Sequence, residues 1–335
     1  MEAKNAVCYV VSGNYTKQLS VSLLSLVKSY LSDVALDVYV FNEQVAAEDL
    51  LVLEKLPAMV GKPQIHVKSH SLVELPAELI GKVKEHLNPL YLQRLFLPGV
   101  LRDYDRVLYL DNDTLLYESV DQLFQQLPVT SEQLIAAVRD FYMYVFGSTT
   151  AVMPIYGVAD VRNYVNAGVV LFNVARYNAT YSRSQLEQLI AANLEMPWLD
   201  QSLLNRLTAD RVHYLDLAYN FQKTDAWLQD WALPTETAAA KEIAQARRMV
   251  KIRHLVDDTS WDHMVAYNQF EVDTFQLLAE VKQLSHVVYQ QANLEAHHWN
   301  KGRGISVGGA LSWLWVKRGN MAQPKVSIII PVYNV

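Results

Sequence analysis

The sequence has little cysteine, no excess of positive charge and no long apolar run. One cysteine, Cys8, among 335 residues excludes an intramolecular disulfide and suits a reducing compartment. Acidic residues outnumber basic ones by 35 to 29, so the formal charge of −6 gives no general attraction to nucleic acid. No apolar run approaches the ~20 residues of a membrane-spanning helix, and the N-terminus lacks the order of a signal peptide. These absences predict a soluble, cytoplasmic protein that does not bind nucleic acid.

Short apolar runs alternate with segments of helical periodicity along most of the chain. Strand-like runs occupy residues 6–11, 36–41, 64–67, 106–110, 134–138, 169–172, 212–215 and 250–255. Helical segments include residues 17–31, 46–56, 181–193, 201–207 and 273–293. This alternation predicts an α/β fold in which helices cover both faces of a mostly parallel sheet. Ligands of such sheets bind outside the carboxyl ends of the strands.

The stretch RVLYLDNDTLLYE (106–118) sets two carboxylates at the end of an apolar run. Side chains alternate along an extended backbone, so Asp111 and Asp113 would leave the strand end on the same side. Two like charges repel there unless a cation lies between them. The pair therefore indicates either a solvated turn, in which Asp and Asn bond to the backbone, or a divalent metal site.

Three kinds of metal-binding protein contain a motif similar to this D-x-D pair. An EF-hand loop starting at Asp111 needs Gly at its sixth position and Glu at its twelfth, but Leu116 and Gln122 stand there. A haloacid dehalogenase-type phosphatase begins with a similar strand and D-x-D-x-T, although Thr114 comes one residue too early; it is a minor alternative. In a nucleotide-sugar glycosyltransferase, a hard divalent cation neutralises charge on the departing diphosphate.

Six segments together resemble glycosyltransferase family 8, the retaining enzymes that include glycogenin and bacterial lipopolysaccharide galactosyltransferases. They are VVSGNY (10–15), YLQRLFLPGVL (91–101), DRVLYLDNDTLL (105–116), NAGVVLFN (166–173), LDQSLLN (199–205) and IRHL (252–255). The resemblance runs from about residue 6 to about residue 261. It implies a GT-A fold, with a Rossmann-like sheet flanked by helices. It also implies transfer of glucose or galactose from a UDP-sugar to a glycan acceptor on a protein or a surface polysaccharide.

The resemblance assigns the metal ligands and the catalytic pair. Asp111, Asp113 and His254 match the metal-binding residues, and this ligand set suits Mn²⁺ better than Mg²⁺, which is the alternative. Without the resemblance, an ordinary hydrogen-bonded histidine would be favoured for His254. Asp200 and Gln201 match the D-Q pair on the reacting face of the sugar. A carboxylate and an amide oxygen there would stabilise positive charge on the sugar.

The donor-binding positions follow from the same resemblance. They are Ser12, Asn14, Tyr15, Arg94, Asn112, Asp140, Asn166, Ala167 and Gly168. Asn14 and Tyr15 match the loop that holds uridine, with the tyrosine ring stacked on the base. Arg94 matches a basic residue near the donor sugar, and Asp140 an acidic residue that holds sugar hydroxyls. The N-A-G segment at 166–168 frames the sugar pocket, where glycine lets the backbone approach closely.

The chain departs from the family at two places. Ser12 stands where several relatives carry an acid that contacts uracil. The family usually follows its metal-binding histidine with a glycine and K-P-W, whereas this chain continues HLVDDTSWDH (254–263), which keeps Trp261 but lacks the glycine and the lysine. Extra carboxylates near a diphosphate are unfavourable unless they point away. A UDP-sugar-binding or regulatory module that has lost turnover is therefore an alternative function.

The C-terminal third indicates a different organisation. The apolar segment GGALSWLWV (308–316), followed by two basic residues, could touch a membrane or a partner, but its length is more typical of a packed helix. KVSIIIPVYNV (325–335) resembles the first strand of family 2 glycosyltransferases; alternatively, it completes the first domain's own sheet. We expect a GT-A domain over residues 1–265 and a helical C-terminal extension and linker over 266–323. Residues 324–335 would begin a second, covalently continuous glycosyltransferase domain.

Overall fold

The computed structural model describes residues 3–82, 88–147, 156–256 and 268–302. The strands are β1 (Asn5–Ser12), β2 (Leu36–Glu43), β3 (Ile65–Ser71), β4 (Arg106–Leu110), β5 (Thr114–Leu116), β6 (Ile135–Arg139), β7 (Val165–Asn173), β8 (Val212–Tyr214) and β9 (Ile252–His254). The helices are α1 (Thr16–Ser29), α2 (Ala47–Met59), α3 (Ala77–Lys82), α4 (Leu97–Val100), α5 (Val120–Gln125), α6 (Phe141–Phe146), α8 (Val174–Thr180), α9 (Arg183–Ala191), α10 (Leu199–Thr208), α11 (Asp225–Trp227), α12 (Ala238–Ala246) and α13 (Gln269–Gly302). Each strand and helix predicted between residues 6 and 293 is present among the described residues, most of them with shifted ends.

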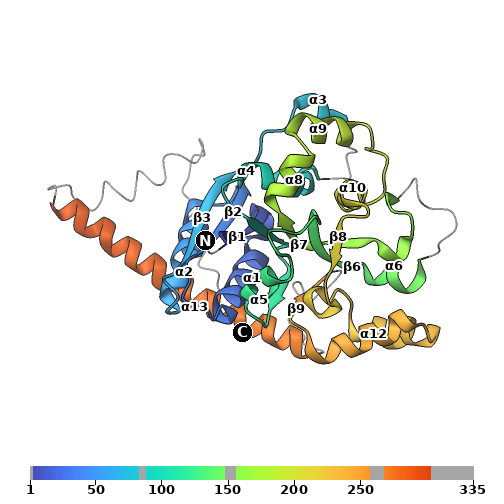
Figure 1. Ribbon diagram of the computed structural model, residues 1–335. Helices are drawn as coiled ribbons and strands as arrows, with labels where there is room; N and C mark the ends of the chain where they lie inside the picture. Colours follow the sequence, from blue (N-terminus) through green and yellow to red (C-terminus); the bar gives the residue numbers. More distant parts are fainter. Residues whose placement is uncertain (1–2, 83–87, 148–155, 257–267, 303–335) are drawn as a thin grey trace, which may run out of the picture. The chain divides into compact units, whose positions relative to one another are not determined.

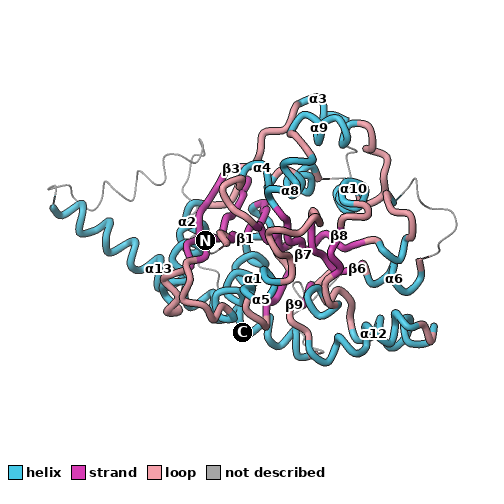
Figure 2. Tube along the Cα trace, viewed as in Figure 1, coloured by secondary structure: helices cyan, strands magenta, loops and turns pink. Residues whose placement is uncertain are grey.

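A seven-stranded sheet lies at the centre of the fold (Figure 1), in the order β3-β2-β1-β4-β7-β6-β8. Strand β7 runs antiparallel to both of its neighbours, β4 and β6, and the other pairs are parallel. Figure 2 shows the strands at the centre with helices around them. The prediction of a mostly parallel sheet flanked by helices is confirmed, and the reversed direction of β7 is the feature that the sequence did not indicate.

Helices cover both faces of the sheet because side chains along its strands alternate between two apolar clusters. In β1, Val7 and Tyr9 pack in one cluster, together with residues of α1, α5 and α12. Ala6 and Cys8 point to the other cluster, which includes residues of α8, α9 and α10. The period of two along a strand sends successive side chains to opposite faces. The buried Cys8 thiol is thus a core group.

A second, two-stranded sheet joins two distant segments beside the carboxyl end of β4. Strands β5 and β9 pair in antiparallel fashion, with Thr114 opposite His254. The backbone N–H of Leu255 also donates to the carbonyl of Asp113 at 2.9 Å. The sequence predicted a strand over residues 250–255 but did not indicate its partner. This pairing brings the IRHL segment to the D-N-D segment.

The chain divides into two compact units, residues 1–285 and 286–335. The first unit includes the beginning of α13, where Phe270, Leu278 and Val281 are buried. Among the helices in the described residues, none is long and apolar enough to cross a membrane. The segment at 257–260, Trp261, the apolar segment 308–316 and the strand-like run 325–335 lie outside the described residues. The domain boundaries proposed at 265 and 323 stay predictions.

Candidate active site

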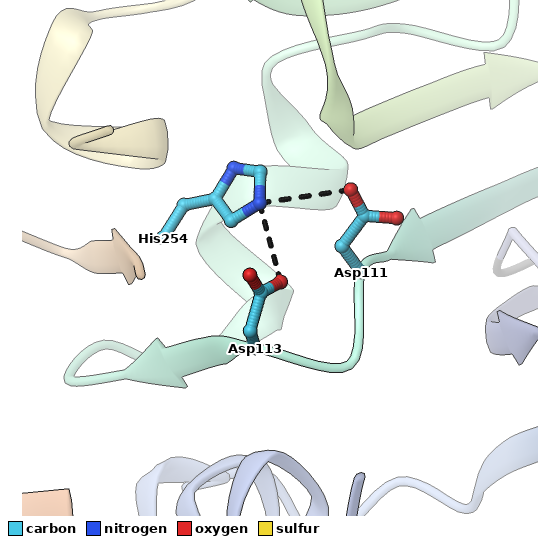
Figure 3. Close-up of side chains that lie close together, drawn as sticks. All are labelled: Asp111, Asp113 and His254. Carbon is cyan, nitrogen blue, oxygen red and sulfur yellow. Dashed lines mark ion pairs between the residues drawn. The ribbon is translucent and has the colours of Figure 1, made fainter. Parts of the chain in front are cut away.

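The two aspartates of the D-x-D motif face His254 (Figure 3). Asp111 directly follows β4, Asp113 directly precedes β5, and His254 is the last residue of β9. The Nε2 atom of His254 is 3.2 Å from Oδ1 of Asp113 and 3.6 Å from Oδ2 of Asp111. Ligand atoms of the three side chains lie within 4.8 Å of one another. The structure therefore brings together the three predicted metal ligands.

Buried asparagines set the orientation of the His254 imidazole. Asn220, fully buried at the end of a 3-10 helix (Leu217–Asn220), places its Oδ1 atom 3.1 Å from Nδ1 of His254. Its Nδ2 donates to Oδ1 of Asn166 at 2.9 Å, so Oδ1 is the acceptor and Nδ1 of His254 is the donor. Nε2 is then left to face the two carboxylates, as a metal-ligating imidazole requires. No motif in the sequence includes Asn220, so its role could not be predicted.

The charges of this cluster fit a hard divalent cation. Burial raises the pKa of Asp113, but the contact with His254, a backbone hydrogen bond and the nearby Arg253 bring that pKa below its ordinary value. Positive charge near this carboxylate thus favours its ionised form. A divalent cation between the two carboxylates would supply such charge. Two carboxylates and one imidazole are a ligand set that suits Mn²⁺ or Mg²⁺.

Gly168, in β7, lies close to two of the predicted metal ligands. A Cβ atom at this position would be 2.1 Å from Cε1 of His254 and 2.9 Å from Oδ2 of Asp111. The backbone N–H of Asp111 also donates to the Gly168 carbonyl at 2.8 Å. Any side chain would therefore displace a ligand. The glycine of the N-A-G segment is required here for space rather than for an unusual backbone angle.

Arg94 is buried between Asp111 and Asp200. Its Nη2 atom is 3.2 Å from Oδ1 of Asp111, and its Nε atom is 3.0 Å from Oδ2 of Asp200. Nη1 donates to the carbonyl of Ala167 at 2.6 Å, and the guanidinium lies over the Tyr109 ring. Burial opposes the charged form, but Asp111, Tyr109 and Asp200 raise the pKa of Arg94 above its ordinary value. Arg94 is therefore a permanent cation inside the site, and not part of a surface salt bridge.

Asp200 and Gln201 lie in the first turn of α10. Burial raises the pKa of Asp200; the Arg94 charge partly opposes this rise, and Asp111 adds to it. The Oε1 atom of Gln201 accepts a hydrogen bond from the backbone N–H of Ala167 at 3.0 Å. The amide oxygen is therefore already engaged with the N-A-G segment. Asp200 is a carboxylate whose negative charge is costly to bury and could be offset by positive charge on a ligand.

A pocket of about 1420 Å³ connects these groups. The predicted site residues that line it are Asn14, Tyr15, Arg94, Asp111, Asn112, Asp113, Asp140, Asn166, Ala167, Asp200, Gln201 and His254. Ser12 and Gly168 are not among the lining residues; Ser12 ends β1 opposite Glu43 of β2. One oxygen of Asp140 accepts from the backbone N–H of Met143 and so caps α6. The structure thus gathers most of the predicted residues around one space.

Two amide oxygens in this pocket are buried without a hydrogen-bond donor from the described residues. They are Oδ1 of Asn112 and Oε1 of Gln18. The Asn112 amide is held in place because its Nδ2 donates to the Val10 carbonyl at 2.9 Å. A buried acceptor without a donor is costly, and a ligand with N–H or O–H groups could satisfy it. Gln18, one turn beyond Tyr15 in α1, was missed by the sequence analysis because no motif includes it.

Other pocket residues carried no motif. They are Tyr142, Phe146, Tyr156, Trp198 and Lys223. The spacing of a single aromatic or basic residue in the sequence does not show whether it lines a pocket, packs in the core or lies on the surface. The one available indication was that Trp198 stands two residues before the D-Q pair.

Comparison with known protein families agrees with this geometry. The family model described as "Glycosyl transferase family 8" matches residues 6–256. The chain belongs to glycosyl transferase family 8. The matched range contains all six segments that carried the resemblance, from VVSGNY at residue 10 to IRHL at residue 255.

Individual relatives match shorter stretches of the chain. Glucoside xylosyltransferase 2 of Mus musculus is 35% identical over 137 residues, which cover 36% of this chain and 30% of that protein. Glycosyltransferase GlyB of Streptococcus pneumoniae is 29% identical over 185 residues, which cover 55% of this chain and 40% of that protein. The chain therefore spans less than half the length of these two relatives.

Solved structures of glycosyltransferases share the fold. The apo structure of WbbM, titled a bifunctional glycosyltransferase, gives a TM-score of 0.68 at 19% identity and covers 87% of this chain and 52% of that one. The galactosyltransferase LgtC, in complex with donor and acceptor sugar analogues, gives a TM-score of 0.63 at 20% identity over 82% of this chain and 95% of that one. At this level of identity the likeness establishes the GT-A fold of this family 8 chain.

Proposed function

We propose that this chain is a retaining, metal-dependent hexosyltransferase that moves glucose or galactose from a UDP-sugar to a glycan acceptor. The observation that carries the proposal is the Arg94–Asp200 ion pair, which lies next to the Asp–Asp–His cluster in one pocket. The Asp–Asp–His cluster would hold a cation that binds the diphosphate. Asp200, next to it, would stabilise the positive charge that develops on the sugar. Family membership supports the reaction class, and the choice of hexose rests on resemblance alone.

The donor would lie across this pocket with its nucleoside at one end. We assign the uracil to Tyr15 and Asn14, and the buried oxygens of Gln18 and Asn112 supply acceptors for donor N–H or O–H groups. Asp111, Asp113 and His254 would hold Mn²⁺, or Mg²⁺, against the diphosphate. The bound metal supplies Lewis-acid charge that stabilises the leaving diphosphate.

The protein's own side chains would stabilise the charge that develops on the sugar. As the bond between the anomeric carbon and the diphosphate stretches, the sugar becomes cationic. The carboxylate of Asp200, which lines the pocket, would stabilise this positive charge. Arg94 holds Asp200 in place through its 3.0 Å contact. Gln201 fixes the backbone of Ala167 beside the sugar position. We favour attack of the acceptor from the face that the diphosphate leaves, because no glutamate among the described pocket residues stands ready as a nucleophile.

A donor screen tests this function. The protein is incubated with UDP-glucose, UDP-galactose or UDP-xylose and Mn²⁺, and released UDP is measured. We expect release from at least one hexose donor and its loss on chelation of the metal. Asp113→Asn should abolish Mn²⁺-dependent UDP binding, whereas Asp103→Asn, at an exposed position outside the pocket, should leave it unchanged. Equal UDP affinity with and without Mn²⁺ in the Asp113 variant would refute the assignment.

The same screen decides between turnover and binding alone. A regulatory module would bind UDP-sugars with Mn²⁺ and release no UDP from any donor. A haloacid dehalogenase-type phosphatase would release inorganic phosphate and would need Asp111 as a free nucleophile. Asp111 instead pairs with Arg94 and faces His254, which favours a ligand role for it.

We also propose that residues 324–335 begin a second glycosyltransferase domain, joined to this one by the region 266–323. The support is the V-S-I-I-I-P-V-Y-N pattern at 326–334. Deleting residues 324–335 should leave the melting temperature and UDP–Mn²⁺ binding unchanged. A fall of many degrees would mean that the run completes the first domain's sheet, because several buried side chains at ~1.5–3 kcal/mol each would be lost.

A further inference from the structure

Arg253 is a buried cation directly before the predicted metal ligand His254. It is the middle residue of β9, where it pairs with Leu115 of β5, and it is 2% exposed. Successive side chains of a strand point to opposite sides, so Arg253 points away from the carboxylates that His254 faces. A guanidinium is expensive to remove from water, and an apolar side chain would fill the same space without that cost. Packing alone therefore does not explain an arginine at this position.

The guanidinium of Arg253 joins two carbonyl groups next to the metal site. Its Nη1 atom donates to the Phe221 carbonyl at 2.8 Å and also to the carbonyl of His254. The backbone N–H of His254 donates to the same Phe221 carbonyl at 2.9 Å. Phe221 directly follows Asn220, whose amide oxygen contacts the imidazole. Arg253 thus fixes both the backbone that carries His254 and the segment that orients its ring.

The first turn of α13 covers this guanidinium. The centroid of the Phe270 ring lies 5.6 Å from Cζ of Arg253 and 4.4 Å from Cζ of Arg247. The negative face of an aromatic ring attracts a cation, and more strongly where water is excluded. Phe270 is buried, so the contact is shielded from solvent. A residue that the sequence analysis placed in the C-terminal extension therefore holds the arginine beside His254.

A second contact ties α13 to the other strand of the pair. Tyr117 directly follows β5, and its hydroxyl donates to Oδ2 of Asp273 at 2.8 Å. The rings of Tyr117 and Phe270 have centroids 5.8 Å apart. Asp113 directly precedes β5 and His254 ends β9. The start of α13 thus contacts both strands of the pair that presents these two ligands.

We propose that Arg253 is a positioning residue for His254, and that Phe270 holds Arg253 in place, so that the start of α13 contributes to metal affinity. The inference rests on the proposed metal-dependent function. Neither residue lines the described pocket, so both act through His254 and not on the donor. Removing the guanidinium would release the His254 carbonyl and let the imidazole leave the position in which it faces Asp111 and Asp113. Loss of an outer contact of a metal ligand typically lowers metal affinity about 10- to 100-fold.

The test measures Mn²⁺ affinity by electron paramagnetic resonance, with UDP present, in the wild type and three variants. Arg253→Met keeps an apolar chain and removes both hydrogen bonds, so we expect the Kd for Mn²⁺ to rise about tenfold or more. Arg253→Lys keeps the charge but lacks the flat fork that reaches two carbonyls, and should recover only part of the affinity. Phe270→Leu keeps an apolar side chain but removes the ring face, and should raise the Kd about threefold.

Ile190→Ala is the matched control for lost stability. Ile190 is fully buried in α9, in the apolar cluster on the other face of the sheet. This change should lower the melting temperature and leave the Kd for Mn²⁺ within about twofold. Electron spin-echo modulation from a bound imidazole nitrogen reports on His254 itself. We expect this signal in the wild type and a weaker one in Arg253→Met at the same Mn²⁺ occupancy.

The proposal is overturned if folded Arg253→Met and Phe270→Leu bind Mn²⁺ as tightly as the wild type. An equal loss of affinity in Ile190→Ala would also overturn it, because reduced stability would then explain the effect. If Arg253→Met does not fold, Phe270→Leu and Arg253→Lys decide the question. A wild type that binds Mn²⁺ but releases no UDP from any donor would refute the transferase function alone, because metal binding needs no turnover. A wild type that binds no Mn²⁺ would refute the metal site and this proposal together.

Discussion

Gly168 lies so close to His254 that a Cβ atom at position 168 would be 2.6 Å from Nδ1 and 2.1 Å from Cε1 of the imidazole. The imidazole cannot move aside freely, because Asn220 holds its Nδ1 atom at 3.1 Å and the ring is buried. The absence of a side chain at position 168 thus leaves the space that the His254 imidazole and the Asp111 carboxylate occupy.

Gly168→Ala should displace His254 and weaken Mn²⁺ binding. The added methyl group competes with the imidazole and with Oδ2 of Asp111 for the same space, so we expect affinity to fall about 10- to 100-fold, as when an outer contact of a metal ligand is lost. Mn²⁺ affinity is measured by electron paramagnetic resonance with UDP present. Gly81→Ala is the control, because a Cβ there meets nothing within 4 Å. Unchanged Mn²⁺ affinity in the Gly168 variant would contradict the placement of His254 in the metal site.

The turnover number should fall with acidification at a pH above the usual aspartate range. Burial raises the pKa of Asp200 from its ordinary 3.8, with Arg94 opposing and Asp111 adding to the rise. Ionised Asp200 is the form that stabilises a cationic sugar, so protonation through the raised pKa removes activity. The effect on stability has the opposite pH dependence. The raised pKa of Asp200 stabilises the folded state at low pH, and this stabilisation is lost as the pH rises through the folded-state pKa. The measurement is kcat against pH, with UDP–Mn²⁺ affinity at each pH as the control. A decline of kcat that only follows UDP affinity would reject this role for Asp200.

Gln201→Ala should lower kcat much more than it lowers UDP affinity. The residue stands on the sugar side of the pocket, and loss of a contact made mainly in the transition state typically costs about 10²-fold or more in kcat. Its Oε1 atom also holds the N–H of Ala167, so Gln201→Glu is the informative partner variant, since it keeps an acceptor oxygen there. Steady-state kinetics and calorimetry with UDP measure the two effects. Parallel losses in the Ala variant, both recovered by Glu, would leave Gln201 with a purely structural role.

The beginning of α13 should be needed for the stability of the first unit. Leu278 is 4% exposed and packs with Val21, with Leu115 of β5 and with Leu255, which directly follows β9 and His254. Leu278→Ala should reduce the free energy of unfolding by about 2–5 kcal/mol, measured by urea denaturation. Leu31→Ala, at a position 76% exposed, should change it by less than about 0.5 kcal/mol. A negligible effect at Leu278 would mean that the domain ends before α13, at the predicted boundary of residue 265.

The sequence by itself determined the elements and the chemistry at the strand ends. Continuous apolar runs in β1 and β4, which are buried on both faces, and helical spacing in α1 depend on contacts that each segment makes with the core. Such local patterns are visible without knowing the partner segment. The D-x-D pair could likewise be assigned to the carboxyl end of a strand, because the apolar run before it ends in charge.

Only the tertiary structure decided which distant groups meet. The pairing of β5 with β9 carries His254 to the aspartates, and nothing in the local pattern of either strand specifies its partner. Burial of Arg94 between Asp111 and Asp200, and the approach of Asn220 to the imidazole, likewise depend on packing between segments. The stacking of Tyr156 on Trp198, the residue that precedes α10, also joins two separate segments. The periodicity of the side chains determines the secondary structure of each segment, but packing between distant segments determines which side chains meet in the site.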